Sequence, residues 1–323
     1  MASTSNENKG MRLIYGDLNL GVAGEDFHYI FSYGKGGPDS LFAGGREWVY
    51  RTPKPTFWRA MTDNDKGCQF PFRSGLWLGA DTFLPCTNRQ LFVDGKEEAG
   101  FFGPDNNRFT NAEYAENVKL IFYFEPIITP KTTVTVTYDI DASGAIKVSM
   151  HYTGTQGLPQ LPAFGWRLIM PTTAKGFTYE GLSGETYPDR MAGGIPGVYE
   201  VEGLPVTPYL VPQECGMHMQ TKWLKICRDT SLDVSKDAPA GYMKIEATDE
   251  TGFNFSCLPY TAQELENATH IEELPLPRRT VLRVDGPVRG VGGIDSWLTD
   301  VEEAYHIRAE EDIDYSFVIS FEQ

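Results

Sequence analysis

The segment best suited to chemistry lies near the C-terminal end and runs Asp285-Gly-Pro-Val-Arg-Gly-Val-Gly-Gly-Ile-Asp-Ser-Trp297. Its four glycines give the backbone unusual freedom, and Trp297 directly follows Asp295 and Ser296. An indole on such a loop either packs into the core or stacks on a ligand, because its apolar face is poorly solvated by water. A sugar ring offers C–H faces to an indole, and its hydroxyl groups need polar partners such as Asp295 and Ser296. The pattern alone favours core packing and ligand binding equally.

A second polar segment runs Phe57-Trp-Arg-Ala-Met-Thr-Asp-Asn-Asp-Lys-Gly67. Asp63, Asn64 and Asp65 have short side chains that accept hydrogen bonds from nearby backbone N–H groups and stabilise tight turns. Their oxygen atoms could also bind a cation, but their spacing lacks the fuller set of acceptors found in a calcium loop. We therefore predict a structural loop here and no metal site.

Two further segments contain candidate acids and bases. Glu185, Asp189 and Arg190 are close enough in sequence to form a local knot of ion pairs and hydrogen bonds. Glycosidases use two carboxylates, yet this spacing of Glu and Asp is common in loops, so a structural role is favoured. His218 could act as an acid or base near neutral pH, but it has no spaced partner, and we expect a structural histidine. No catalytic residue is predicted on this chain.

The elements that must position these residues are strands, because the dominant period along the chain is two. Apolar residues alternate with others through 118–124, 134–140, 146–152 and 313–321. Turn residues at 141–144 separate the second and third of these runs, which predicts a β-hairpin with one buried face. Helical signals are few: a capping box at Thr261–Glu264 and a short candidate at Ser74–Ala80. We therefore predict an all-β fold, a large antiparallel β-sandwich.

The chain of 323 residues is long enough for one large all-β domain. Residues 1–10 are polar and are expected to be disordered, and residues 11–323 are expected to form a single domain. The glycine- and proline-rich stretch Ala192–Pro205 lies between segments of the same all-β character. We interpret it as a loop within that domain.

The composition excludes several classes of partner. A formal net charge of −16, without a cluster of Lys or Arg, argues against nucleic acid and acidic membranes, whereas a neutral sugar meets no electrostatic penalty. The N-terminus lacks the apolar region of a signal peptide, and no apolar run reaches the length of a membrane span. The five cysteines form no CxxC pair. These features predict a cytoplasmic protein without a membrane anchor or a zinc site.

Together the motifs resemble the C-terminal domain of the bacterial β-galactosidases of glycoside hydrolase family 2. The family's F-x-R-A-P-x-D-N-D-x-G pattern is matched by Phe57–Gly67, with Met61 in place of proline. Its G-x-x-E-x-Y-P-D-R pattern is matched with slight drift by Gly181–Arg190, which has one extra residue before the Glu. Its T-P-Y-x-x-P-x-E-x-G and G-x-G-G-x-D-S-W patterns follow in order and are matched by Thr207–Gly216 and Gly290–Trp297. The resemblance covers about residues 12–323, nearly the whole chain.

The resemblance implies a galactose-mutarotase-like β-sandwich, which in the family follows a TIM barrel that carries both catalytic glutamates. In some bacteria the enzyme is divided, and a small subunit of about this length supplies the domain separately. The resemblance further implies that Trp297 forms a platform for the substrate in the active site of the barrel, with Asp295 and Ser296 beside it. Divalent and monovalent cations are expected on the large subunit, and no cofactor is expected on this chain.

The implied function is that of the small subunit of a heteromeric β-galactosidase. It would complete the substrate site of a catalytic large subunit for the retaining hydrolysis of lactose and other β-galactosides, and would be inactive alone. Two alternatives stay open: a stand-alone carbohydrate-binding module and an aldose epimerase of mutarotase-like fold. An epimerase needs a His and a Glu that converge in one cleft, and His218 has no such Glu that the sequence can place.

Overall fold

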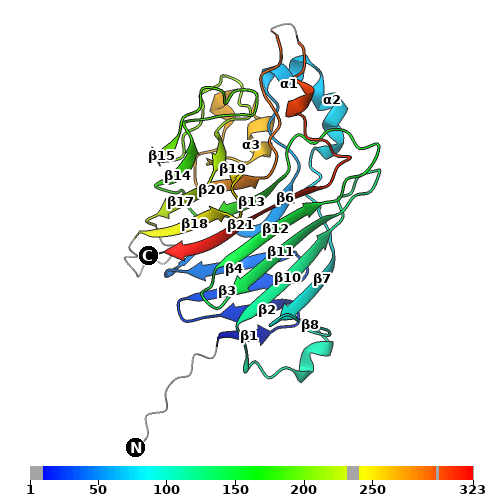
Figure 1. Cartoon of the computed structure of the whole chain (residues 1–323), viewed down its shortest axis with the longest axis vertical. Helices are drawn as coiled ribbons and strands as arrows, with labels where there is room; N and C mark the ends of the chain where they lie inside the picture. Colours follow the sequence, from blue (N-terminus) through cyan, green and yellow to red (C-terminus); the bar gives the residue numbers. More distant parts are fainter. Residues whose placement is uncertain (1–9, 231–239, 296–297, 323) are drawn as a thin grey trace, which may run out of the picture.

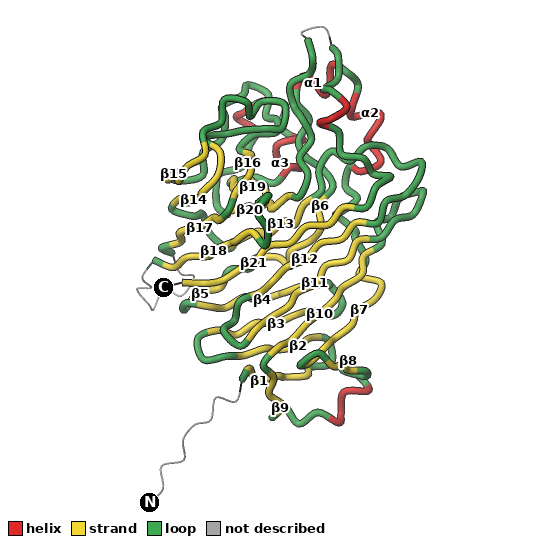
Figure 2. The backbone as a smooth tube through the Cα atoms, viewed as in Figure 1, coloured by secondary structure: helices red, strands yellow, loops and turns green. Residues whose placement is uncertain are grey.

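The computed structural model describes residues 10–230, 240–295 and 298–322 of the chain. Within these residues the strands form three antiparallel sheets of ten, six and five strands. The short helices α1 (Asp63–Gly67) and α2 (Phe70–Ser74) lie at one end of the molecule, and β1 lies at the opposite end (Figures 1 and 2). Residues 1–10 are expected to be disordered, and residues 1–9 of this segment lie outside the described part of the chain.

The largest sheet has the order β15-β14-β17-β18-β21-β12-β11-β10-β7-β8. Its strands, in chain order, are β7 (Cys86–Val93), β8 (Lys96–Glu98), β10 (Asn117–Phe124), β11 (Val134–Asp141), β12 (Ile146–Tyr152), β14 (Gly176–Leu182), β15 (Pro196–Glu202), β17 (Trp223–Arg228), β18 (Gly241–Ala247) and β21 (Ile313–Glu322). β11 and β12 pair with Val136 opposite Met150, which confirms the predicted hairpin. β21 lies between β12 and β18, so the strand nearest the C-terminus is interior to the sheet.

Two smaller sheets complete the architecture. The six-stranded sheet has the order β5-β4-β3-β2-β1-β9, from β1 (Met11–Tyr15), β2 (Asn19–Ala23), β3 (Phe27–Ser32), β4 (Gly37–Ala43), β5 (Arg46–Glu47) and β9 (Glu113–Ala115). The five-stranded sheet has the order β16-β19-β20-β13-β6, from β6 (Arg51–Thr56), β13 (Gly165–Met170), β16 (Met217–Thr221), β19 (Phe253–Leu258) and β20 (Thr280–Asp285). Every strand pairing in the described residues is antiparallel, which confirms the predicted all-β class.

The core lies between the ten-stranded sheet and the two smaller sheets. Phe31 of the six-stranded sheet packs against Tyr138, with ring centroids 5.5 Å apart. Trp166 of the five-stranded sheet packs against Phe317 at the same centroid distance and donates its indole N–H to the Tyr138 hydroxyl at 3.1 Å. Burial alternates along β10, β11 and β12, so each of these strands turns one apolar face into this core.

Two local predictions need correction. The stretch predicted as a loop at 192–205 contains β15, because Tyr199 and Val201 pack their alternating side chains against the core while the strand pairs with β14. The short helix predicted at Ser74–Ala80 lies earlier, as α2 followed by a single 3₁₀ turn at Gly75–Trp77. Pro71 sits in the first turn of α2, where a missing N–H costs nothing.

The other predicted helix is confirmed. α3 (Ala262–Asn267) begins after Thr261, whose hydroxyl accepts from the Glu264 backbone N–H while the Glu264 carboxylate accepts from the Thr261 N–H. None of the helices in the described residues is long and apolar enough to cross a membrane.

Candidate functional site

The glycine-rich segment continues directly from β20, the central strand of the five-stranded sheet, whose six residues are all buried. We call residues 286–300 the glycine loop. It extends to the end of the molecule where α1 and α2 lie (Figure 1). The backbone N–H of Ile294 donates to the carbonyl of Asp300 at 3.3 Å and closes the tip of the loop.

Asp65 joins two arginines at the base of the glycine loop. Arg59 donates to both of its carboxylate oxygens, at 2.6 and 3.1 Å, and Arg289 donates to Oδ1 at 3.0 Å. Arg59 also donates to the carbonyl of Gly290 at 3.2 Å. The Arg59, Asp65 and Arg289 side chains are buried, so each charge depends on the others for compensation.

The Asp65 carboxyl group is held ionised. Burial by itself raises the pKa of this carboxyl, but the charges of Arg59 and Arg289 outweigh burial and hold the pKa below its ordinary value. Asp65 also completes a capping box with Thr62 at the start of α1. The predicted structural role of this segment is therefore confirmed, but the predicted loop is wrong for Asp63–Gly67, which form the helix α1 because the Thr62–Asp65 capping box satisfies its first N–H groups.

Asp300 fixes the far end of the glycine loop. Its Oδ1 accepts from Arg289 at 2.5 Å, and its Oδ2 accepts from Arg73 of α2. Burial acts to raise the pKa of Asp300, but Arg289 lies close enough to keep it below its ordinary value. The buried guanidinium of Arg289 therefore binds both Asp300, at the end of the glycine loop, and Asp65 of α1.

Asp189 holds the middle of the glycine loop. Its two carboxylate oxygens accept from the backbone N–H groups of Val291 and Gly292, at 3.0 and 2.6 Å. Asn64 adds a hydrogen bond to the carbonyl of Val291 at 3.1 Å. The predicted local knot is therefore only partly right, since Arg190 lies 3.7 Å from Asp189 but the hydrogen bonds of Asp189 go to the loop.

The glycines of the loop serve close packing more than backbone freedom. Among Gly286, Gly290, Gly292 and Gly293, Gly293 is the one with a positive φ, 87°. A Cβ at Gly292 would collide with the guanidinium of Arg190, and one at Gly290 would lie 3.0 Å from Cγ of Asp189. The prediction of unusual freedom is wrong for those two positions, because neither has a positive φ and the side chains of Asp189 and Arg190 lie close to the backbone there.

Of the three predicted substrate-binding residues, the structure describes Asp295 alone, near the tip of the glycine loop. Asp295 is exposed, and its Oδ2 accepts from the Thr299 hydroxyl at 2.9 Å. Ser296 and Trp297 lie outside the described residues, and the roles of all three stay predictions. Leu298 has a φ of 71°, a left-handed conformation that is costly for a branched side chain.

Comparison with known proteins places the chain in a family. A family model described as "Beta galactosidase small chain" matches residues 23–319. This protein belongs to the β-galactosidase small chain family. A β-galactosidase small subunit from Latilactobacillus sakei is 56% identical over 318 residues, which is 98% of this chain and 100% of that relative.

Longer relatives contain an equivalent of the small chain. A β-galactosidase from Halalkalibacterium halodurans is 32% identical over 98% of this chain but only 29% of its own length. BgaC, a β-galactosidase from Bifidobacterium adolescentis, is 33% identical over 92% of this chain and 26% of its own length. The small chain thus spans less than a third of these two proteins. Among solved structures, a putative aldose 1-epimerase from Escherichia coli K12 is similar over 97% of this chain, with 10% identity and a TM-score of 0.43.

A second buried ion cluster supports the strand from which the glycine loop starts. Arg283 of β20 contacts Glu214 at 2.6 Å and Asp285 at 2.8 Å. Burial raises the pKa of Asp285 to about 7, against the opposing effect of Arg283. Glu214 belongs to the Thr207–Gly216 motif, and through Arg283 it supports β20, from which the glycine loop continues. This motif therefore helps to position the loop, as do Phe57–Gly67 and Gly181–Arg190.

His218 is a structural residue, as predicted. It is buried among aromatic rings, stacked on Phe255 with centroids 4.8 Å apart and close to Tyr179 at 4.5 Å. Burial lowers the pKa of His218 to about 4, although a hydrogen bond to the backbone of Gly184 acts in the opposite direction. A neutral imidazole in such surroundings is a poor acid or base for a ligand.

Sequence reasoning missed three residues of the site. Arg59 lies inside the Phe57–Gly67 motif and Arg289 directly precedes the Gly290–Trp297 motif, but nothing in their spacing pairs them through Asp65. Asp300 lies beyond the last motif and gives no signal of its own. Only the folded chain shows that these residues meet.

Proposed function

We propose that this small chain completes the sugar site of a catalytic large subunit, with Trp297 as a platform and Asp295 and Ser296 as polar partners. The observation that supports this proposal is the anchoring of the glycine loop at its start, middle and end, by Asp65, Asp189 and Asp300. A platform residue stabilises a bound sugar only if its carrier is held in place before the sugar arrives.

The chemistry of the reaction belongs to the partner in this proposal. Retaining glycoside hydrolysis needs two carboxyl groups about 5–5.5 Å apart, one as acid/base and one as nucleophile. We place both on the large subunit, together with the divalent and monovalent cations of the family. The small chain contributes positioning: stacking and burial of one indole supply at most a few kcal/mol.

The end of the molecule that carries the glycine loop has the surface expected of a subunit contact. The large apolar side chains of Ile294, Leu298 and Phe72 are 61%, 68% and 87% exposed. Such side chains gathered near a functional loop are typical of a surface that a partner covers. A stable contact between the subunits would bury more than about 1,000 Å² in total.

The substrate class follows from the same proposal. We propose lactose and other β-galactosides as substrates, lactose catabolism as the role, and the cytoplasm as the place of action. A neutral sugar is compatible with a chain of net charge −16, and nucleic acid and membrane surfaces are not proposed as partners.

Reconstitution tests this function. The purified small chain is expected to release no nitrophenol from o-nitrophenyl β-galactoside, and addition of its large subunit is expected to give full activity at about equimolar ratio. Robust turnover by the small chain alone would contradict the proposed division of labour.

The epimerase alternative has no support from the described residues. It needs a histidine that can exchange protons with a ligand, and the burial of His218 among Phe255, Tyr179 and Phe177 removes the candidate. A polarimetric assay of galactose mutarotation by the small chain is expected to show no rate above buffer.

A further inference from the structure

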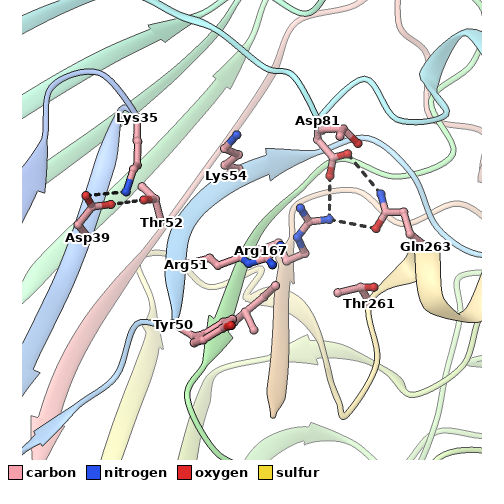
Figure 3. Close-up of a pocket in the computed structure, with 12 residues that line it drawn as sticks. Lys35, Asp39, Tyr50, Arg51, Thr52, Lys54, Asp81, Arg167, Thr261 and Gln263 are labelled. Atoms are coloured by element: carbon pink, nitrogen blue, oxygen red, sulfur yellow. Dashed lines mark hydrogen bonds and ion pairs between the residues drawn. The ribbon is translucent and has the colours of Figure 1, made fainter. Parts of the chain in front are cut away.

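A polar cavity lies away from the glycine loop, against strands β4, β6 and β13 and the start of α3 (Figure 3). Its volume is about 770 Å³. The residues that line it include Lys35, Arg51, Lys54 and Arg167, and an adjoining hollow that shares Arg51 adds Arg278 and Arg279. Six of the 28 Lys and Arg residues of a strongly acidic chain therefore gather around one site.

The carboxylates of this site already have partners. Asp81 is buried and contacts Arg167 at 2.8 Å, and Gln263 donates to it at 3.3 Å. Asp39 contacts Lys35 at 2.9 Å and accepts from the Thr52 hydroxyl. In the adjoining hollow, Glu264 is engaged in the capping box of α3. The remaining cations consequently outnumber the acids available to neutralise them.

Lys54 is the cation that most needs a partner. The pairing of β6 with β13 sets it directly opposite Arg167, and like charges opposite one another on neighbouring strands destabilise a sheet. Figure 3 shows the Lys54 side chain between the Lys35–Asp39 pair and the Asp81–Arg167 pair, without a dashed line to either. Among the described residues, no hydrogen bond or ion pair involves its ammonium group.

The ionic state of Lys54 agrees with this placement. It is half-buried, and burial lowers the pKa of its ammonium group, with Arg167 and Lys35 adding to the effect and Asp81 opposing it. An anion bound beside it would reverse this shift and offset the repulsion between Lys54 and Arg167.

We propose that this cavity is a binding site for a phosphate monoester, with Lys54 and Arg51 as the principal cationic contacts. A phosphate group accepts hydrogen bonds on three oxygens, which suits an ammonium and a guanidinium that approach from one strand. The cavity is far larger than a phosphate group. It therefore has space for a sugar attached to the phosphate.

Isothermal titration calorimetry on the full-length small chain at low ionic strength tests the proposal. The probes are glucose 6-phosphate, inorganic phosphate and glucose. We expect saturable binding of glucose 6-phosphate that weakens as salt rises, and no binding of glucose. Equal affinity for inorganic phosphate would identify free phosphate as the source of the anion, and weaker affinity would identify the phosphorylated sugar.

Variants connect the binding to the cavity. Lys54→Gln and Arg51→Gln are each expected to weaken glucose 6-phosphate binding by about tenfold or more, whereas Lys54→Arg keeps the charge and most of the affinity. Lys147→Gln, at an exposed position on β12, is the matched control and should leave affinity unchanged. If Lys54→Gln does not fold, the affinity of the Arg51→Gln variant tests the proposal, because Arg51 is exposed and its replacement should leave the fold intact. The proposal is overturned if neither phosphate compound binds at about 10 mM, if glucose binds as well as its phosphate, or if the folded variants bind like the unmodified chain.

Discussion

The carboxylate of Asp189 accepts a 2.6 Å hydrogen bond from the backbone N–H of Gly292, which lies 103 residues further along the chain. Its other oxygen accepts from the neighbouring Val291. Two parallel backbone donors on one ionised side chain fix both the position and the orientation of the glycine loop at its middle. The loop that is proposed to carry the sugar platform is thus held by a residue from a distant motif.

Asp189→Ala should loosen this loop without unfolding the sandwich. The change leaves two backbone N–H groups without their charged acceptor, each bond of this kind contributing about 1.5–3 kcal/mol. We expect KM of the reconstituted enzyme for o-nitrophenyl β-galactoside to rise several-fold, and the melting temperature of the small chain to fall by several degrees while the sandwich stays folded. Glu185→Gln, at an exposed carboxylate that accepts from the Thr207 hydroxyl and makes no contact with the glycine loop in the described residues, is the control and should leave KM unchanged. An unchanged KM for Asp189→Ala would show that the middle anchor has no functional role.

Asp65→Asn should cost the small chain about 3–5 kcal/mol of unfolding free energy, because it leaves the buried Arg59 and Arg289 without their shared counter-charge. Urea denaturation followed by tryptophan fluorescence measures this loss. Asp63→Asn, at an exposed position two residues earlier, should change stability by less than about 0.5 kcal/mol. Equal stabilities of the two variants would contradict the account of the buried charges.

His218 should make the stability of the small chain sensitive to acid. Its pKa is about 4 when folded and near its ordinary value of 6.5 when unfolded, so the unfolded chain binds the extra proton between those values. The stabilising contribution is complete above about pH 6.5 and is lost as pH falls toward 4, by on the order of 3 kcal/mol. Urea titrations across this range should show a shallower pH dependence for His218→Phe than for the unmodified chain. The exposed His28→Gln is the control, and identical slopes for the His218 variant and the unmodified chain would refute the assignment.

Leu298→Asp should weaken association with the large subunit by about tenfold or more, because it places a charge on the apolar surface proposed as the contact. The variant should remain folded, since this side chain is 68% exposed. Sedimentation velocity of subunit mixtures gives the dissociation constant. Leu18→Asp is the control, because Leu18 is 77% exposed between β1 and β2, at the end of the molecule away from α1 and α2 (Figure 1). Equal dissociation constants for the two variants would remove this surface from the interface.

The sequence predicts the strands of the core well, but it does not predict the contacts that hold the glycine loop in place. Alternation at Val134–Ile140 and Ile146–Tyr152 is a local signal, since successive side chains of a strand point to opposite faces. β15 was missed because glycines and prolines at 192–205 hide an edge strand whose faces are both partly exposed. Helix α3 was found because a capping box needs only four consecutive residues.

The site depends on contacts that no local pattern encodes. Arg289 reaches Asp65 across 224 residues, and Asp300 belongs to no motif at all. Spacing shows which residue types occur near one another in sequence, but the meeting of distant segments depends on how the three sheets pack. For this reason the motifs could be recognised as a set while their common role, anchoring the glycine loop, stayed hidden.

The central claim is that Trp297 reaches a sugar bound by the partner subunit. The most direct test measures kcat and KM of the reconstituted enzyme for lactose with Trp297→Ala, beside Trp297→Phe, which keeps an aromatic face. We predict that KM rises by about 10- to 100-fold in the alanine variant and by less in the phenylalanine variant, with subunit association intact. A KM equal to that of the unmodified enzyme in the assembled alanine variant would contradict the account.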